Sequence, residues 1–271
     1  MIRLFIIVFI SIFTLSFNFG QNDSLVIKPD CNYFKSYISD SKRLITSPVK
    51  WNYKEWCGFA GFTATTLLTI KYDENIYNYF DKQHNLFNDN LSKYGLEPWG
   101  SGLYTLPVMG LFYLQGSISG NTKSKNTALL GTKAFIYSAF FVQIPKYLFN
   151  RHRPYNDITP DPYLFDGPFT GKYYKSFFSG HTTCVFSVAT VVSSVYNDKP
   201  WVAFLSYTIA TLSGISRVYD KKHWGSDVVA GAFLGYAIGK FVYNENYNKI
   251  KINLYTDYST NGIKLTYYLN Q

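Results

Sequence analysis

The sequence predicts an all-α protein, a bundle of about six core helices, from two observations. Apolar stretches rich in Gly, Ala and Thr recur along the chain, and each is too long and too continuous for a strand. Polar segments, several of them with Pro or Gly, separate these stretches, as expected for helices joined in a bundle. The stretches cover residues 57–70, 101–118, 128–149, 181–196, 201–216 and 228–243.

The N-terminus has the layout of a secretory signal peptide. Arg3 is followed by an apolar run from Leu4 to Phe17, and small and polar residues come next. The run is shorter than the roughly 20 residues that a membrane span needs. We therefore expect a cleaved signal peptide over residues 1–20 and export to the periplasm or the cell envelope, with an uncleaved anchor helix as the alternative.

Three segments follow the signal peptide. A polar and aromatic arm over residues 21–56 has no clear period and is expected to be irregular apart from one short helix. Residues 57–245 hold the helical domain. The tail, over residues 246–271, predicts a small C-terminal β-hairpin, because two alternating runs flank Asn261-Gly262, a dipeptide common in hairpin turns.

Composition and charge narrow the class of partner. The formal net charge is +9, which favours anionic partners such as phosphates or an acidic membrane surface. Nucleic acid is not expected, because the Lys and Arg residues form no long basic run and no nucleic-acid-binding signature occurs. The apolar stretches are short for membrane spans. If the helices did cross the bilayer, the bundle end that carries most of the Lys and Arg residues would lie on the exported side, against the positive-inside tendency. These two points favour a soluble or membrane-resting protein over one that crosses the bilayer repeatedly.

The cysteines leave two arrangements open. In an exported protein Cys31 and Cys57 can form a disulfide, and the alternative is no disulfide at all. Cys184 lies in an apolar stretch and is expected to be a buried small apolar residue. No Cys/His spacing resembles a zinc site, so no metal is expected.

Chemistry-bearing residues gather near the ends of the predicted helices, in three groups. The first group is KYLFNRHRP, in which Lys146 and Arg153 stand seven residues apart, two turns along one helical face. Pro154 is expected to stop this helix. The segment therefore predicts two cations at the end of the third helix.

The second group is SFFSGHTT, immediately before the fourth apolar stretch. Ser179 stands where a helix N-cap belongs, and Gly180 permits a ligand to approach the free N–H groups of the first turn. His181 follows in that turn. The segment therefore predicts a site that binds an anion next to His181, a side chain that can act as an acid or a base.

The third group is SRVYDKKHWGSD, between the fifth and sixth stretches. Arg217 is expected at the end of the fifth helix and His223 near the start of the sixth. Asp227 comes four residues after His223. Both are therefore expected on one helical face, where the carboxylate can hold the imidazole.

The three groups are expected to meet at one end of the bundle, because the third and fifth helices would end where the fourth and sixth begin. Three cations there can stabilise the charge on a phosphate and in its transition state. One histidine, oriented by Asp227, can attack phosphorus, and the other can protonate the leaving oxygen. The set provides for phosphoryl transfer without a metal.

These residues carry a resemblance to a known family. The patterns K-x6-RP at 146–154, SGH at 179–181 and SR-x5-H-x3-D at 216–227 resemble the three-part signature of the type 2 phosphatidic acid phosphatases. Their superfamily also includes class A acid phosphatases and vanadium haloperoxidases. The resemblance extends over about residues 100–243 and keeps the order and internal spacing of the motifs.

The resemblance implies a role for each residue. His223 would form a phosphohistidine, Asp227 would orient it, and His181 would be the general acid. The phosphate-binding residues would be Lys146, Arg153, Ser179, Gly180 and Arg217. The family commonly has proline before Ser-Gly-His, whereas this chain has Phe178, which is expected to alter the loop or the pocket wall without removing a catalytic group.

The resemblance also implies a metal-independent phosphatase that acts on a phosphomonoester or pyrophosphate. The expected substrate is lipid-linked, such as phosphatidate, an isoprenyl pyrophosphate or a lipid A phosphate. No cofactor is expected, and vanadate would act only as a phosphate mimic or inhibitor. Three alternatives stay open: a soluble acid phosphatase of broad specificity, a vanadium haloperoxidase, and a non-catalytic anion-binding protein of the envelope.

Overall fold

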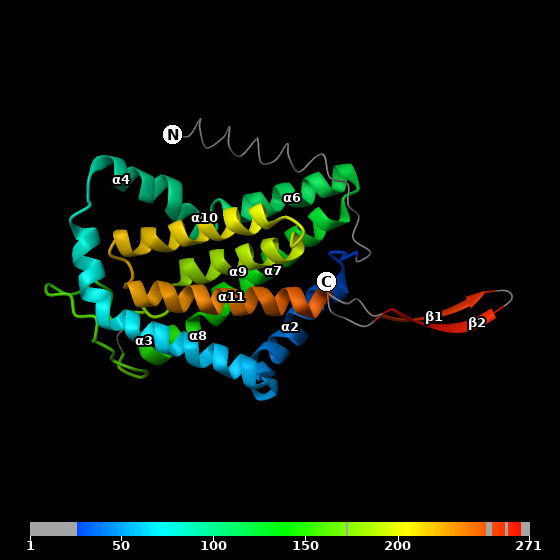
Figure 1. Ribbon diagram of the computed structural model, residues 1–271, viewed down its shortest axis with the longest axis horizontal. Helices are drawn as coiled ribbons and strands as arrows, with labels where there is room; N and C mark the ends of the chain where they lie inside the picture. Colours follow the sequence, from blue (N-terminus) through cyan, green and yellow to red (C-terminus); the bar gives the residue numbers. More distant parts are fainter. Residues whose placement is uncertain (1–25, 172, 248–250, 258–259, 267–271) are drawn as a thin grey trace.

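The computed structural model describes residues 26–171 and 173–247, together with the backbone of 251–257 and 260–266. The expected signal peptide over residues 1–20 lies outside the described residues. Apart from two terminal strands, the regular elements of the described residues are helices, which confirms the all-α prediction (Figure 1). The elements are α2 (Cys31–Thr46), η1 (Ser47–Lys50), α3 (Tyr53–Asp81), α4 (Leu86–Asn90), η2 (Leu91–Leu96), α5 (Glu97–Gly100), α6 (Thr105–Ser119), α7 (Thr122–Phe141), α8 (Gln143–Phe149), α9 (Gly180–Val195), α10 (Pro200–Tyr219), α11 (Gly225–Tyr247), β1 (Lys251–Asp257) and β2 (Thr260–Thr266).

The helices that correspond to the predicted stretches form the bundle. α9 packs against α7, α10 and α11, while α6 packs on α7 and α3 packs on α11. The third stretch, 128–149, is divided between α7 and α8. α3 begins before its predicted stretch, because Asn52 and Glu55 form a capping box that satisfies N–H groups at the helix start.

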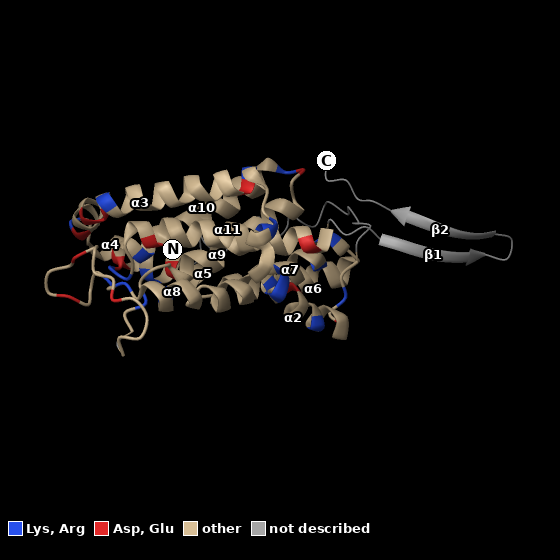
Figure 2. Ribbon diagram, turned by 90° about the horizontal axis from the view of Figure 1, so that it is seen from below, with Lys and Arg blue, Asp and Glu red and all other residues tan. Residues whose placement is uncertain are grey.

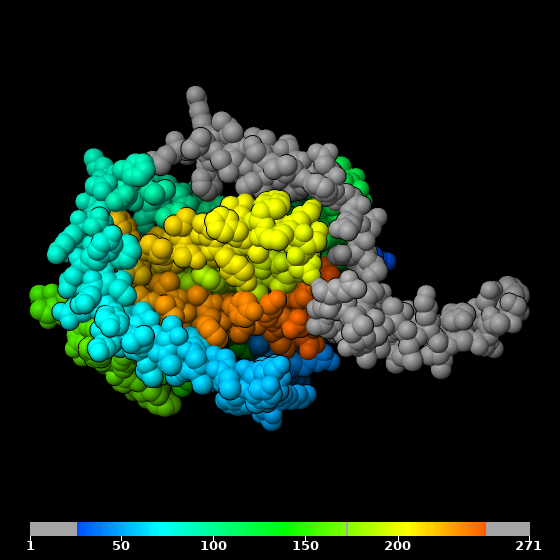
Figure 3. Space-filling model, viewed as in Figure 1, coloured from blue at the N-terminus to red at the C-terminus, as the bar shows by residue number. Residues whose placement is uncertain are grey.

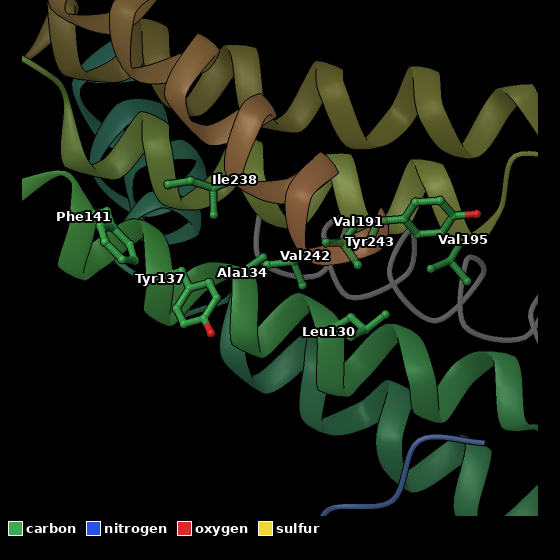
Figure 4. Packing of buried hydrophobic residues seen from close by; sticks show 9 residues of the cluster. All are labelled: Leu130, Ala134, Tyr137, Phe141, Val191, Val195, Ile238, Val242 and Tyr243. Carbon is green, nitrogen blue, oxygen red and sulfur yellow. The ribbon is translucent and has the colours of Figure 1, made fainter. Parts of the chain in front are cut away.

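The centre of the bundle is a cluster of buried apolar side chains between α7, α9 and α11 (Figure 4). Leu130 and Val191 are completely buried, and burial of an aliphatic side chain of this size stabilises a fold by about 1.5–3 kcal/mol. The cluster holds together the three helices around which the rest of the bundle packs. Its members are Leu130, Ala134, Tyr137, Phe141, Val191, Val195, Ile238, Val242 and Tyr243.

The N-terminal arm is more regular than the sequence predicted, because α2 is a helix of 16 residues that docks on α7. Lys133 of α7 is fully buried, and its Nζ donates to Asp40 Oδ2 at 2.6 Å and to Ser36 Oγ at 2.8 Å. The same ammonium lies 5.1 Å from the ring centroid of Tyr37. A buried ion pair whose hydrogen bonds are satisfied therefore fixes α2 against the bundle.

Glycines of α11 lie directly against the backbone of α9. A Cβ added at Gly235 would stand 2.4 Å from the carbonyl oxygen of Thr183, and one at Gly231 would stand 2.6 Å from that of Ser179. Small residues at four-residue intervals allow two helices to approach this closely. The resulting contact fixes the start of α11 against the start of α9. We call these residues the glycine stripe: Gly231, Gly235 and Gly239.

Gly235→Ala is expected to lower the stability of the fold by about 1–3 kcal/mol, because the new methyl group would push two backbones apart. Denaturant or thermal unfolding measures the change. The matched control is Gly110→Ala on α6, where nothing lies within 4 Å of an added Cβ. This control is expected to be neutral or stabilising, because Ala has the higher helix propensity. Equal unfolding midpoints for the two variants would contradict the importance of the stripe.

Large apolar side chains are exposed on the outer faces of the bundle. Figure 2 shows charged residues mainly toward the two ends, with little charge along the middle of α3 and α10. Exposed apolar surface of this kind marks contact with a membrane or a protein partner. We call the following set the apolar belt: Phe59, Leu67 and Leu68 of α3, Leu106 and Leu114 of α6, Ile136 and Phe140 of α7, Phe204 and Leu212 of α10, and Phe233 of α11.

The length and hydropathy of the helices show which of them could span a membrane. Among the described helices, the stretch Thr122–Phe149 is long and apolar enough to cross a membrane. More than half of its most apolar window is buried inside the bundle, so core packing accounts for much of that apolar character.

The C-terminal strands β1 and β2 pair antiparallel, with Asp257 opposite Thr260. Asn261 lies opposite Thr256 inside β2, and Gly262 follows it in the same strand. In this pairing Asn261-Gly262 lies within β2, whereas the sequence analysis expected the turn at this dipeptide.

The cysteines are unpaired. Cys31 and Cys57 are both exposed and free, which is the second of the two arrangements left open by the sequence. Cys184 is buried, as predicted, and its Sγ lies 3.9 Å from the carbonyl oxygen of Phe135.

Candidate active site

The three predicted groups of residues lie at one charged end of the bundle, on the left of Figures 1 and 2. α8 and α10 end there, and α9 and α11 begin there. The loop between α8 and α9 lies at this end of the molecule, at the left margin of Figure 3. The helix ends are thus arranged as the sequence predicted.

Asp227 is completely buried and accepts hydrogen bonds from several donors. Arg151 Nη1 donates to its Oδ1 at 2.6 Å, and the backbone N–H of Trp224 donates to its Oδ2 at 2.9 Å. The hydroxyl of Ser176 also donates to Oδ2. His223 Nδ1 lies 3.4 Å from the same oxygen. The carboxylate therefore faces Nδ1 of the imidazole and leaves Nε2 available for chemistry.

His223 and Asp227 do not share a helical face, so that part of the prediction is wrong. α11 begins at Gly225, after His223, and Asp227 lies in its first turn. The Asp227 carboxylate reaches back to the N–H of Trp224, as capping carboxylates do at helix starts. The turn before α11, rather than a helical period, brings the two side chains together.

Arg151, which no motif assigns, links Asp227 to α3. Its side chain is completely buried, and Nη2 donates to Asp73 Oδ2 at 2.8 Å while Nη1 donates to Ser226 Oγ at 2.7 Å. Sequence reasoning missed this network, including Ser176. The one signal was a second arginine in RHRP, but its partners Asp73 and Asp227 are 78 and 76 residues away along the chain.

Lys146 and Arg153 do not share a helical face, so that part of the prediction is also wrong. α8 ends before Asn150, whose left-handed backbone (φ 43°) turns the chain, so Arg153 lies in the loop beyond the helix. The loop still holds both cations close together. Lys146 Nζ donates to the carbonyl of Lys175 at 2.6 Å, and Arg153 Nε donates to that of Tyr174 at 3.1 Å.

Ser179 is the N-cap of α9, as predicted. Its Oγ accepts hydrogen bonds from the N–H of Thr182 at 3.4 Å and from the hydroxyl of Thr182 at 2.9 Å. Its own N–H donates to the carbonyl of Asp227 at 2.9 Å. A Cβ added at Gly180 would stand 3.5 Å from Lys146 Cε. The free N–H groups of the helix start thus lie beside a cation, an arrangement that suits an anion.

Phe178, which stands where the family commonly has proline, is packed by aromatic rings. Its ring centroid lies 6.4 Å from that of Phe149 and 6.3 Å from that of Phe62. These contacts between α8, α3 and the loop support the segment that leads into Ser179.

His181 lies in the first turn of α9 and faces a carboxylate that the sequence analysis did not single out. His181 Nε2 is 2.8 Å from Glu97 Oε1 on α5. Arg217, in the last turn of α10, has Nη1 at 3.8 Å from the same oxygen and pairs through Nη2 with Asp220. Glu97 escaped notice because α5 is short and carries no recognisable motif.

Burial and charge set the protonation of this end. Burial lowers the pKa of His223 to about 3; the hydrogen bond with Asp227 opposes this effect, and the charges of Lys146 and Arg153 reinforce it. Burial also lowers the pKa of His181, an effect that Arg217 reinforces and Glu97 opposes. The imidazole of His223 is therefore neutral, which is the form that can attack an electrophile.

All eight predicted residues thus lie at the same end of the bundle. Within the described part of the chain, no group of three or more His, Cys, Asp and Glu side chains could hold a metal ion. The eight residues are Lys146, Arg153, Ser179, Gly180, His181, Arg217, His223 and Asp227.

The helical bundle and its charged end define the class of protein. Residues 127–251 match the model of the PAP2 superfamily. The matched residues contain all three motifs.

Two relatives with similar sequences have names that describe phosphatases. Lipid A 1-phosphatase of Porphyromonas gingivalis is 29% identical over 186 residues, which cover 66% of this chain and 36% of the relative. Undecaprenyl-diphosphatase of Sulfolobus acidocaldarius is 31% identical over 149 residues, which cover 54% of this chain and 62% of the relative. The matches therefore span about a third and about three fifths of the lengths of these relatives.

A solved structure shares the fold. The crystal structure of a transmembrane PAP2 type phosphatidylglycerolphosphate phosphatase from Bacillus subtilis superposes with a TM-score of 0.53 at 21% identity. The superposition covers 69% of this chain and 94% of the other. At this level of identity the likeness concerns the fold.

Proposed function

We propose that this chain is a phosphatase that removes phosphate from a lipid-linked phosphomonoester or pyrophosphate, through a phosphohistidine and without a metal. The observation that carries the proposal is the buried pair of His223 and Asp227, with Nδ1 3.4 Å from Oδ2, at the bundle end where the cations lie. The names of the relatives from P. gingivalis and S. acidocaldarius support a lipid-linked substrate.

In the first step His223 Nε2 attacks phosphorus. The N–P bond forms while the P–O bond to the leaving group breaks, and His181 donates a proton to the leaving oxygen. Asp227 orients the attacking imidazole and stabilises the positive charge that develops on it. The non-bridging oxygens are held by the phosphate cradle, which comprises Lys146, Arg153, Ser179, Gly180 and Arg217.

In the second step water attacks the phosphohistidine. His181, now neutral, accepts a proton from the water as its oxygen bonds to phosphorus and the N–P bond breaks. Inorganic phosphate is released, and His223 returns to the neutral form. The cradle serves both steps, because each passes through a transition state with the same distribution of charge over the phosphoryl oxygens.

The apolar belt supports a membrane-associated protein. A lipid substrate lies in a membrane with its phosphate at the polar surface, and the belt lies beside the charged end that would receive this phosphate. The belt favours a lipid substrate over the small esters of a soluble acid phosphatase. The signal-peptide pattern of residues 1–20 supports export to the periplasm or the cell envelope.

The test is phosphate release from a long-chain lipid phosphate and from a small aryl phosphate, measured side by side in detergent with a chelator present. The wild type is expected to act on the lipid phosphate, and the His223→Ala variant controls for phosphatases carried over from the host. Efficient release from both substrates would indicate broad specificity. Loss of activity with chelator would contradict the metal-independent mechanism, and peroxide-dependent bromide oxidation with vanadate would indicate a haloperoxidase.

A further inference from the structure

Glu97 lies against the residue assigned as general acid. Its Oε1 is 2.8 Å from His181 Nε2 and 3.8 Å from Arg217 Nη1. The side chains of His181 and Glu97 are 32% and 29% exposed, whereas those of His223 and Asp227 are 4% and 0% exposed. The contact of His181 with Glu97 is therefore more open to solvent than the contact of His223 with Asp227.

Packing of α5 fixes this contact. A Cβ added at Gly100 would stand 2.7 Å from His181 Cβ, so the two helices touch with no space for a side chain. Trp99 packs against a buried cluster of α9 and α10, and Thr105 donates to its carbonyl at 2.7 Å. The backbone that carries Glu97 is thus held against His181 by the fold itself.

We propose that Glu97 is a positioning residue that orients His181 and stabilises its protonated form, so that His181 can protonate the leaving group. The inference rests on the proposed phosphatase function. A carboxylate that accepts a hydrogen bond from one ring nitrogen fixes the tautomer and the orientation of the imidazole. Each histidine of the site would then have its own carboxylate, Asp227 for His223 and Glu97 for His181.

The proton follows a defined route. Protonated His181 donates Nε2–H to Glu97. The proton that remains for the substrate in this proposal is Nδ1–H. As the P–O bond breaks, the Nδ1 proton passes to the leaving oxygen, and the ring becomes neutral with Nε2–H retained. In the second step Nδ1 accepts a proton from the attacking water, which restores the imidazolium. Glu97 remains ionised throughout.

The charges around His181 show why a carboxylate is needed. Glu97 faces it from α5, Arg217 from α10 and Lys146 from α8. Burial and the two cations lower the pKa of His181, and Glu97 raises it. Loss of the Glu97 charge therefore favours the neutral imidazole, which has no proton to give to the leaving oxygen.

The test compares kcat/KM of the wild type and Glu97→Gln on two substrates that share one alkyl chain. A long-chain alkyl phosphate needs protonation of its leaving oxygen, whereas a nitrophenyl phosphate carrying the same chain does not. We expect kcat/KM of Glu97→Gln to fall about 10- to 100-fold on the alkyl phosphate and less than about 3-fold on the nitrophenyl phosphate. The alkaline limb of the alkyl phosphate profile is expected to move to lower pH.

Asp220→Asn is the matched control, because Asp220 contacts Arg217 without contacting His181. Its effect is expected to be the same factor on both substrates. An equal loss on both substrates in Glu97→Gln, with the limb unmoved, would overturn the inference and leave the phosphatase proposal intact. Absence of hydrolysis by the wild type would instead defeat the proposed function.

A second variant keeps the test independent of folding. Glu97→Asp keeps the charge but withdraws it from His181 by one methylene group. We expect kcat/KM of Glu97→Asp to fall more on the alkyl phosphate than on the nitrophenyl phosphate, by a smaller factor than in Glu97→Gln. Circular dichroism checks that the variant is folded. Equal effects of Glu97→Asp on the two substrates would also overturn the inference.

Discussion

Replacement of His223 by alanine is expected to lower phosphate release from a lipid phosphate by at least about 10⁴-fold, because the N–P bond can no longer form. In the structure the imidazole is buried, its Nδ1 faces Asp227 at 3.4 Å, and burial lowers its pKa to about 3. The ring is thus neutral and oriented before substrate arrives. The measurement is the initial rate of phosphate release in detergent.

A trapping experiment tests whether His223 carries the phosphoryl group. The wild type is expected to be recovered with a covalently bound radioactive phosphate, and His223→Ala without one. Radiolabelled lipid phosphate is mixed with protein and quenched in alkali, which preserves phosphohistidine, and mass spectrometry locates the label. The matched control is His84→Ala, whose exposed histidine pairs with Asp89 at 2.9 Å and packs on Tyr219 rather than on a residue of the proposed mechanism. This control is expected to keep the wild-type rate and label. Label at another residue would contradict the assignment of His223.

Arg151→Met is expected to destabilise the fold by about 3–5 kcal/mol, because it removes the cation from a buried ionic network. The side chains of Arg151, Asp73 and Asp227 are all 0% exposed. Methionine fills much of the same volume, so most of the loss would come from two carboxylates left without a cation. Unfolding by denaturant measures the change.

The pH dependence of the loss of stability in Arg151→Met distinguishes an electrostatic cause from a packing cause. Burial by itself raises the pKa of Asp227, but Arg151 and the hydrogen bonds of His223 and Ser176 outweigh it and hold the pKa well below its usual range. A lowered pKa stabilises the folded state above the unfolded pKa, and Arg151→Met removes this contribution. The deficit is therefore expected to be larger at about pH 8 than at about pH 4. A deficit independent of pH would contradict the electrostatic account.

Asp73→Asn serves as the control for the same network. Asp73 contacts Arg151 at 2.8 Å, whereas Arg151 contacts Asp227 through its other terminal nitrogen. The variant leaves one arginine paired with one carboxylate, so we expect a smaller loss of stability and a kcat within about 3-fold of wild type. In Arg151→Met, kcat is expected to fall further, because a protonated Asp227 cannot stabilise the charge that develops on His223.

Continuous apolar stretches were enough to predict the bundle, because a buried helix needs apolar residues over its whole length. The boundaries depended on other contacts. The stretch 128–149 shows no break in composition, yet the structure divides it between α7 and α8. The regularity of α2 was not predictable from its polar sequence, because it depends on Lys133, a residue of α7 that is buried against Asp40.

The residues of the site also differ in whether local sequence or distant contacts determine their roles. Residues within the motifs are predictable because their spacing along the chain places them at helix ends. Arg151 and Glu97 were missed because their roles depend on contacts with residues that are distant in sequence, 76 residues to Asp227 and 84 residues to His181. Arg153 was assigned to the helix because the seven-residue spacing suited one, whereas Asn150 turns the chain first.

The glycine stripe has a consequence for how such a protein can diversify. The N–H of Ser179 bonds to the carbonyl of Asp227 at 2.9 Å, and Gly231 lies against the carbonyl of Ser179. Main-chain contacts, rather than side chains, therefore set the spacing between the turn that carries His181 and the turn that carries Asp227. Substitutions on the outer helices can alter which organic group is accepted while the reacting groups keep their positions, so one catalytic frame can be inherited by enzymes with different substrates.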